Sequence, residues 1–550
     1  MKTLTSFFKV SSACLLLFLT VSCDSLLNEE LKNEVTADNY FETDEQFVSA
    51  MGDAYNPFAQ TYGSNQGLGA LMVAADDFVV PQKGADWEDG GIWIRLHRHT
   101  YTSNDPGIDQ TWQQLFAGVS SANRLLFQFQ DLIDAGEVSE ELAVPFLTEL
   151  RAVRAYYYYI LLDRFGNVPI ITSFEDVPEN PSQPSSDFDA GRQAVFEFVE
   201  SELLASLDNL ETDVVSTRGR MNKWVAHTTL AKLYLNAEVY TGEPRWEDAI
   251  THANAVIESG NYTLMANYSD NFTVDNNDSP ENIFLIPYDK VFLPGFNLHL
   301  MTLCPSCKPV YGMTGGAWAG FQATTDFYNL HIDPEINPGP QGTVVGLDEQ
   351  GSETTGTLDE RLNNLIVGPQ FSIEGERIVD GAAISEDPDG PPVTLTPYIN
   401  ELEPQALRQS GARVGKYQFE IGLTGNNMSN SFVVQRYSDV LLTKAEALWR
   451  LNPGSSEALM LVNEVRARSG VDAFSELTAD NLLEERARET FYEMVRRQDL
   501  IRFQGKVGAT RYNDPWQFKD TSEEYRNVFP IPLSQLEANA NLVQNPGYAQ

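Results

Sequence analysis

Basic residues are scarce in this sequence. It contains 37 Lys and Arg against 78 Asp and Glu, and its formal net charge is −41 at pH 7. A surface of this sign repels the phosphates of nucleic acids, so DNA and RNA are excluded as expected partners. The same charge disfavours sulfated or uronate-rich polymers as ligands, unless a local basic patch receives them.

Long apolar runs are almost absent as well. The one near the N-terminus covers residues 10–21 and follows a basic start. Twelve residues are too few to span a bilayer, which needs about 20, but they are typical of a secretory signal. Ser22-Cys23 follows as at a lipoprotein cleavage site, so residues 1–22 are predicted to be a signal peptide and Cys23 the lipid anchor. Leu19 lies one residue farther from Cys23 than is usual, and the alternative is an ordinary secreted protein with a chance cysteine.

Cysteine is rare, with four residues in the chain. Cys14 leaves with the signal peptide and Cys23 carries lipid, so Cys304 and Cys307 remain, in "LCPSCKP". Such a pair could be a redox motif, half of a zinc site or a local disulfide. Zinc needs two more ligands, and His299 is the only histidine nearby. In an exported protein we favour a structural disulfide between Cys304 and Cys307, placed in a loop.

Catalytic signatures are missing too. The sequence contains no G-x-S-x-G, H-E-x-x-H, P-loop or dinucleotide fingerprint. We therefore predict no enzyme, no catalytic residue, no metal ligand and no cofactor. A secreted glycoside hydrolase stays open as an alternative, because two positioned carboxylates suffice for that chemistry. His97 and His99 alternate in "LHRHT", but they lack a third ligand and are interpreted as surface residues.

What the sequence does contain is strong helical periodicity. An apolar stripe runs through "RWEDAITHANAVIESG", and with the preceding segment it predicts a tetratricopeptide-like hairpin of two helices. Further helices are predicted at 109–134, 139–165, 188–210, 437–451, 455–468 and 479–503. Residues of about 281–430 are instead rich in Gly, Pro, Asn and Asp. The predicted fold is mostly α, with helical hairpins as a scaffold around a large loop-rich insert.

Four consecutive tyrosines, Tyr156 to Tyr159, stand in "AYYYYILLDRFG". Four neighbours in a helix point around most of its circumference, so this helix cannot keep one face polar. We expect it to be buried among other helices, with its hydroxyls on polar partners.

Several motifs together resemble the SusD/RagB family of Bacteroidetes outer-membrane lipoproteins. They are "LRAVRAYYYYILLDRFGNVPII", "RYSDVLLTKAEAL", "VNEVRARSGV", "EERARETFYEMVRRQDLIRFQGK" and "VFPIPLSQLEANANLVQNPGY". They follow one another in family order, so the resemblance covers essentially the mature chain. One departure is "ETFYEMVRRQDL", where the family usually has a small Glu-Gly step before its arginine.

The resemblance implies a nutrient-binding lid with a SusD-like fold. Its regions would be an N-terminal SusD-like helical region at 23–280 and a RagB/SusD C-terminal region at 281–550, which includes the insert. Such a protein faces the outside of the outer membrane, anchored by lipid, and delivers oligosaccharides to a SusC-like TonB-dependent transporter. The alternative within the same system is a peptide ligand, as for RagB-like members.

A glycan site needs flat aromatic faces and polar groups for hydroxyls. The best candidates are aromatic residues expected in loops, where they lack packing partners. Trp87 and Trp93 lie in "GADWEDGGIWIR", and Tyr311 and Trp318 lie in "VYGMTGGAWAGF". These four residues are the predicted ligand contacts. The remaining tryptophans of the helical stripes, among them Trp246, are expected in the core.

Overall fold

The computed structural model describes residues 41–332, 344–347, 353–381, 391–505 and 511–549. The chain divides into two compact units, residues 1–47 and 48–550, and the fold and sites below belong to the second. The signal peptide and Cys23 lie outside the described residues, so the lipid anchor stays a prediction. The division of the chain at 280/281 also stays a prediction.

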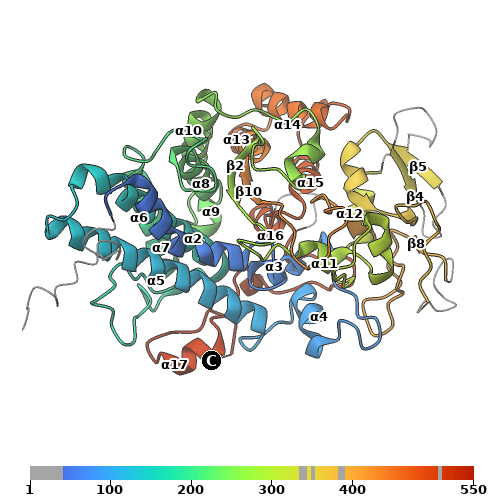
Figure 1. The fold of residues 1–550 in the computed structure, drawn as a ribbon, viewed down its shortest axis with the longest axis horizontal. Helices are drawn as coiled ribbons and strands as arrows, with labels where there is room; N and C mark the ends of the chain where they lie inside the picture. The colour runs from blue at the N-terminus through green and yellow to red at the C-terminus, as the bar shows by residue number, and fades with distance from the viewer. Residues whose placement is uncertain (1–40, 333–343, 348–352, 382–390, 506–510, 550) are drawn as a thin grey trace, which may run out of the picture. The chain divides into compact units, whose positions relative to one another are not determined.

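Helices dominate the described residues, as the periodicity predicts (Figure 1). Their bounds are α2 Asp44–Thr61, α3 Leu68–Leu71, α4 Ile92–His97, α5 Pro106–Asp134, α6 Glu140–Phe165, α7 Phe188–Ser206, α8 Lys223–Leu235, α9 Ala237–Thr241, α10 Trp246–Glu258, α11 Leu298–Thr302, α12 Thr325–Asn329, α13 Tyr437–Leu451, α14 Ser456–Arg468, α15 Ala479–Thr490, α16 Arg496–Arg502 and α17 Leu533–Ala538.

The long helices pack against one another in pairs. Helix α5 packs on α6 and α6 on α7, while α8 packs on α10, α10 on α13 and α13 on α14. Figure 1 shows α8, α10 and α13 side by side, although almost 180 residues separate α10 from α13. The predicted arrangement of helical hairpins from both ends of the chain as one scaffold is confirmed.

The four tyrosines lie on α6 and all are buried. The ring of Tyr157 stacks on Phe58 with 4.1 Å between centroids, and its hydroxyl donates to the carbonyl of Ala54 at 2.7 Å. The hydroxyl of Tyr158 donates to the carbonyl of Pro169 at 3.1 Å. Helix α6 ends at Gly166, whose φ of 73° is one that glycine adopts without strain. The expectation of a buried helix with paired hydroxyls is confirmed.

Strands in the described residues form five antiparallel pairs. The longest pair joins β2 (Asn282–Ile286) to β10 (Phe432–Arg436), so it closes the insert at its base. The others are β1 (Phe78–Val79) with β3 (Gln322–Ala323), β4 (Val344–Leu347) with β5 (Glu353–Thr357), β6 (Leu365–Ile366) with β9 (Arg413–Val414), and β7 (Gly368–Pro369) with β8 (Thr394–Leu395).

A single helix over 479–503 was the one clearly wrong helical prediction. The segment is broken between α15 and α16, because Tyr492 and Met494 adopt φ values of 61° and 64°. Left-handed backbone is costly for residues with a Cβ, and no glycine marks the break in the sequence. The turn lies in the stretch that departs from the family pattern.

Buried ion pairs fasten the insert to the helices. Arg436, at the end of β10, contacts Glu281 at 2.8 Å and Glu489 of α15 at 2.5 Å, and all three side chains are fully buried. Arg361 in the insert contacts Glu485 of α15 at 2.8 Å. Removing one partner of such a cluster leaves an uncompensated buried charge, which costs about 3–5 kcal/mol. These contacts therefore fix the position of the insert on the scaffold.

Candidate functional site

Trp87 and Trp318, two of the predicted ligand contacts, meet in the structure. Trp87 lies on a turn with a left-handed φ of 64°, and its Nε1 donates to the carbonyl oxygen of Trp318 at 2.6 Å. The indole also covers Gly320, where an added Cβ would lie 2.6 Å from Cζ2 of Trp87. Glycine at 320 is therefore required for this close approach.

Trp93 was expected to be an exposed loop residue, and that expectation is wrong. It lies on helix α4 and is only 4% exposed. Its Nε1 donates to Oδ2 of Asp89 at 2.8 Å, and its ring meets Trp87 edge to face with 5.6 Å between centroids. On its other side it packs on Phe321 at 5.9 Å. Trp93 therefore packs against Trp87 from the buried side and offers no free ring face to a ligand.

The backbone around Trp318 is held by helix α11. The amide of Trp318 donates to Leu300 at 2.7 Å, and that of Ala319 donates to Leu303 at 3.0 Å. Trp318 itself is 39% exposed. Because its backbone is already fixed, only the side chain has conformational entropy to lose when a ligand covers it.

Tyr311 lies apart from the two tryptophans, at the end of the 3₁₀ helix η6 (Pro305–Tyr311). Its ring meets Phe419 edge to face at 4.7 Å, and burial raises the pKa of its hydroxyl to about 12. Its carbonyl accepts from the amide of Gly422 at 2.8 Å. The carbonyl of Leu423 accepts the amide of Thr314 at 3.0 Å, so the 420–426 loop contacts the segment that joins Tyr311 to Trp318.

Cys304 and Cys307 are joined by a disulfide, with their Cα atoms 5.0 Å apart. Both are buried, and they begin η6 rather than a loop. The amide of Cys307 donates to the carbonyl of Cys304 at 2.9 Å. The pair thus closes the turn between α11 and Tyr311.

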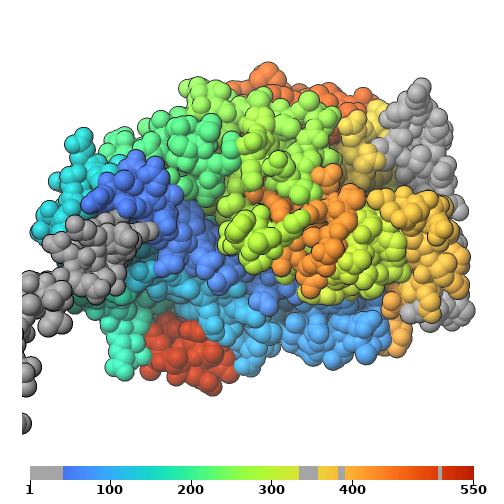
Figure 2. Space-filling model, in the orientation of Figure 1, coloured from blue at the N-terminus to red at the C-terminus, as the bar shows by residue number. Residues whose placement is uncertain are grey.

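The sequence did not point to the other exposed apolar side chains of this surface. Phe292 is 88% exposed, on a turn where the amides of residues 291 and 292 donate to Oδ1 of Asp289. Lys290 pairs with Glu420 and so joins this turn to the 420–426 loop. In Figure 2 the yellow-green surface near residue 290 adjoins the orange surface near 420. Further exposed apolar residues of the insert are Phe371, Ile373 and Ile421.

Polar groups flank the paired tryptophans. The carboxylate of Asp86 lies 3.6 Å from Arg408, which also contacts Asp380 at 2.8 Å. Asn426 accepts the amide of Gly316 at 2.8 Å through its Oδ1. Lys83 donates to the carbonyl of Ala319 at 2.9 Å. Exposed carboxylate, guanidinium and amide groups beside flat rings are what sugar hydroxyls require for orientation.

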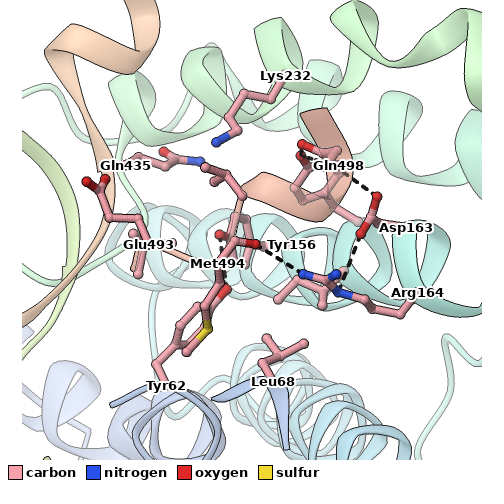
Figure 3. Close-up of a pocket in the computed structure, with 14 residues that line it drawn as sticks. Tyr62, Leu68, Tyr156, Asp163, Arg164, Lys232, Gln435, Glu493, Met494 and Gln498 are labelled. Atoms are coloured by element: carbon pink, nitrogen blue, oxygen red, sulfur yellow. Dashed lines mark hydrogen bonds and ion pairs between the residues drawn. The ribbon is translucent and has the colours of Figure 1, made fainter. Parts of the chain in front are cut away.

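A cavity beside helix α6, which carries the four tyrosines, is not a site for a sugar ligand (Figure 3). Its volume is about 50 Å³, and its lining includes Tyr156, Lys232 and Glu493. Lys232 contacts Asp439 at 2.6 Å and Glu493 contacts Lys416 at 2.5 Å, so its charges are neutralised within the core. A space of this size holds one or two waters, whereas ligand pockets measure about 300–1,000 Å³.

An apolar groove of about 460 Å³ is large enough for a ligand and lies elsewhere. Met51, Tyr55 and Pro287 line it, and Arg218 and Arg220 stand at its rim. Both arginines are paired, with Asp278 and with Glu149. The groove offers a ligand apolar surface, but few of its polar groups are not already paired within the protein.

The two histidines expected on the surface are in fact buried. His97 donates through Nε2 to the carbonyl of Gln517 at 2.8 Å, and burial lowers its pKa to about 4. His99 lies 3.0 Å from Oγ of Ser522. Across the described ranges no group of three His, Cys, Asp or Glu side chains could hold a metal ion, and no helix there is long and apolar enough to cross a membrane.

Taken together, a helical scaffold carries a loop-rich face with exposed aromatic side chains, among them Trp318 and Phe292. Two family models match the chain. The family model described as "SusD family" matches residues 280–548, and that described as "Starch-binding associating with outer membrane" matches residues 24–235. The chain belongs to the SusD family.

Individual relatives are distant in sequence but similar in fold. The starch-binding protein SusD of Bacteroides thetaiotaomicron is 26% identical over 494 residues, which cover 84% of this chain and 82% of the relative. A solved structure of surface glycan-binding protein A from Bacteroides uniformis covers 92% of this chain and 99% of its own, at 22% identity and a TM-score of 0.68. A laminarin-binding SusD-like protein aligns with a TM-score of 0.65 at 20% identity, covering 92% of this chain and all of its own.

Proposed function

We propose that this chain is a surface-exposed, lipid-anchored nutrient-binding protein that captures oligosaccharides and delivers them to a SusC-like TonB-dependent transporter of the outer membrane. The observation that carries the proposal is the Trp87–Trp318 pair, in which the indole of Trp87 is hydrogen-bonded to the backbone of the exposed Trp318, beside carboxylate and amide groups. Family membership and the glycans named for its relatives support a carbohydrate as the ligand.

The binding surface is proposed to consist of Trp87 and Trp318, with Tyr311 at its margin. Apolar ring faces match the C–H faces of pyranose rings, and each ring that stacks on a ligand contributes about 1–3 kcal/mol, on the scale measured for nucleic-acid bases. Trp93 remains in the site as the support of Trp87. The protein binds its ligand without converting it, because its relatives are named for binding and its sequence carries no catalytic signature.

The ligand class can be tested by calorimetry on the protein without its lipid. Starch and laminarin oligosaccharides form one panel, matched by length with neutral peptides. The proposal expects saturable binding to at least one glycan, no binding to peptides, and unchanged oligosaccharide lengths by chromatography after prolonged incubation. Binding to peptides alone would favour the RagB-like alternative, and shortened oligosaccharides would favour a hydrolase.

A variant that fills the apolar groove separates the two possible locations of the ligand. Gly52 lines the groove and has no atom within 4 Å of the position of a Cβ, so Gly52→Leu should narrow the groove from a Cβ that fits. We expect this variant to bind glycans as the wild type does. Loss of binding in Gly52→Leu would place the ligand in the groove instead of at the tryptophans.

A further inference from the structure

Two histidines on neighbouring helices face each other outside the site described above. His227 lies on α8 and His252 on α10, and these helices pack side by side (Figure 1). Their Nδ1 atoms are 2.9 Å apart. The remaining four histidines of the chain are buried, so this is the one histidine pair with partial access to solvent.

Aromatic neighbours hold both imidazole rings in place. The ring of His227 stacks on Trp224 with an interplanar angle of 25°, and the ring of His252 stacks on Tyr234 with an angle of 26°. The two imidazoles are themselves 5.1 Å apart between centroids. Both aromatic neighbours belong to α8, so they hold His227 on its own helix and His252 across the contact between α8 and α10.

The separation of the nitrogens fits two ligands of one metal ion. Bonds from imidazole nitrogen to a divalent transition metal are about 2.0–2.1 Å long. Two such bonds at about 90° place the nitrogens about 2.9 Å apart, whereas the tetrahedral angle preferred by zinc requires about 3.3 Å. A right angle is the angle between neighbouring ligands in the square-planar and octahedral geometries of Cu²⁺ and Ni²⁺.

We propose that His227 and His252 form a binding site for a divalent transition metal ion, Cu²⁺ in preference to Ni²⁺ or Zn²⁺. The order follows the general affinities of nitrogen ligands, in which Cu²⁺ ranks highest. No third protein ligand is present among the described residues, so water completes the coordination. The site lies on the helical scaffold and is independent of the proposed glycan site.

The charges nearest the pair are balanced. Glu200 of α7 and Asp248, one turn before His252 on α10, both pair with Arg245, at 3.2 and 2.5 Å. Neutral imidazole is the form that binds metals, so the ion is offered at pH 7, above the ordinary pKa of histidine.

Without a metal, the same distance arises when one imidazole donates its Nδ1–H to the other. The experiment must therefore detect the ion itself. The untagged protein, stripped with a chelator, is titrated with CuCl₂, NiCl₂ and ZnCl₂ by calorimetry at pH 7, and the Cu²⁺ form is examined by electron paramagnetic resonance. We expect one equivalent of Cu²⁺, coupling to two imidazole nitrogens, and a higher melting temperature with Cu²⁺ present.

Two variants decide the assignment. His227→Phe keeps a ring to stack on Trp224 but removes the nitrogens, and His252→Gln removes the second ligand. Each should bind Cu²⁺ at least tenfold more weakly and should melt at the same temperature with and without it. Asp248→Asn, a control that keeps both histidines, should retain the two-nitrogen signal. Absence of Cu²⁺ binding at micromolar concentration in the wild type, or unchanged binding in both histidine variants, would overturn the proposal.

Discussion

The indole nitrogen of Trp87 donates a hydrogen bond to the carbonyl oxygen of Trp318, 2.6 Å away, across 231 residues of sequence. This contact joins the loop before α4 to the loop after the disulfide turn. Trp93, beneath Trp87, continues through Phe321 to Tyr492 as a series of edge-to-face rings. The aromatic rings that begin at Trp87 therefore form a series of contacts that reaches the turn between α15 and α16.

Gly320→Ala should weaken ligand binding. A Cβ at residue 320 would lie 2.6 Å from the indole of Trp87 and must displace it. We expect about a tenfold loss of affinity, which corresponds to a loss of about 1.4 kcal/mol of binding free energy. Calorimetry with the best glycan measures it. Gly425→Ala on the same face meets no atom within 4 Å and is the matched control. Equal affinities for the two variants would show that the position of Trp87 does not matter.

Cys23→Ser should prevent attachment to the membrane. The thiol of Cys23 is the predicted site of the lipid, and serine cannot form the thioether. Fractionation of cells and labelling with fatty acid should find the variant unprocessed or soluble, and without label. A labelled variant that stays in the outer membrane would exclude Cys23 as the anchor.

The sequence predicted the scaffold well and the site only in part. Helix α13 covers 437–451 as predicted, because its apolar stripe and its neighbours agree. The break at Tyr492 has no local signal, since the left-handed backbone there is imposed by tertiary contacts. Trp87 and Trp318 were identified from their loop context, but their contact depends on the folded chain. Phe292 was missed because a single apolar residue in a turn has no periodicity.

Glu446→Gln should destabilise the protein in a pH-dependent way. Burial alone would raise the pKa of Glu446, but Arg502 and Arg450 outweigh it and lower the pKa to about 2. The ionised carboxylate therefore contributes stability above its ordinary pKa of 4.5, and this contribution is lost as the pH falls toward 2. At pH 7 the variant should lose up to about 3–5 kcal/mol, since the buried Arg450, Arg486 and Arg502 lose the carboxylate that they share.

Denaturant unfolding at pH 7 and pH 3 measures this difference. Glu457→Gln, which removes a half-exposed partner of Lys444, is the control and should cost less than about 1 kcal/mol. A penalty for Glu446→Gln that is the same at both pH values would contradict the assignment of a lowered pKa.

Asp77→Asn should stabilise the protein in alkaline solution. Burial and the neighbouring Asp76 raise the pKa of Asp77 to about 8, although Arg496 opposes them. The folded state therefore keeps a proton that the unfolded state has lost. The stability associated with this proton is complete below pH 3.8 and is lost as the pH rises through about 8, by up to about 1.4 kcal/mol per unit. The melting temperatures of the wild type and of Asp77→Asn should coincide at pH 4 and differ at pH 8. The same difference at both pH values would refute the raised pKa of Asp77.

The proposed function requires that the exposed side chain of Trp318 binds the ligand. Calorimetry on Trp318→Ala, with Trp224→Ala as control, measures this contribution. Trp224 is partly exposed and donates through Nε1 to the backbone carbonyl of Thr212 at 3.0 Å, but it lies on α8. We predict about a tenfold or greater loss of glycan affinity for Trp318→Ala, with its melting temperature nearly unchanged, and wild-type affinity for Trp224→Ala. Wild-type affinity in a folded Trp318→Ala would exclude Trp318 as a ligand contact.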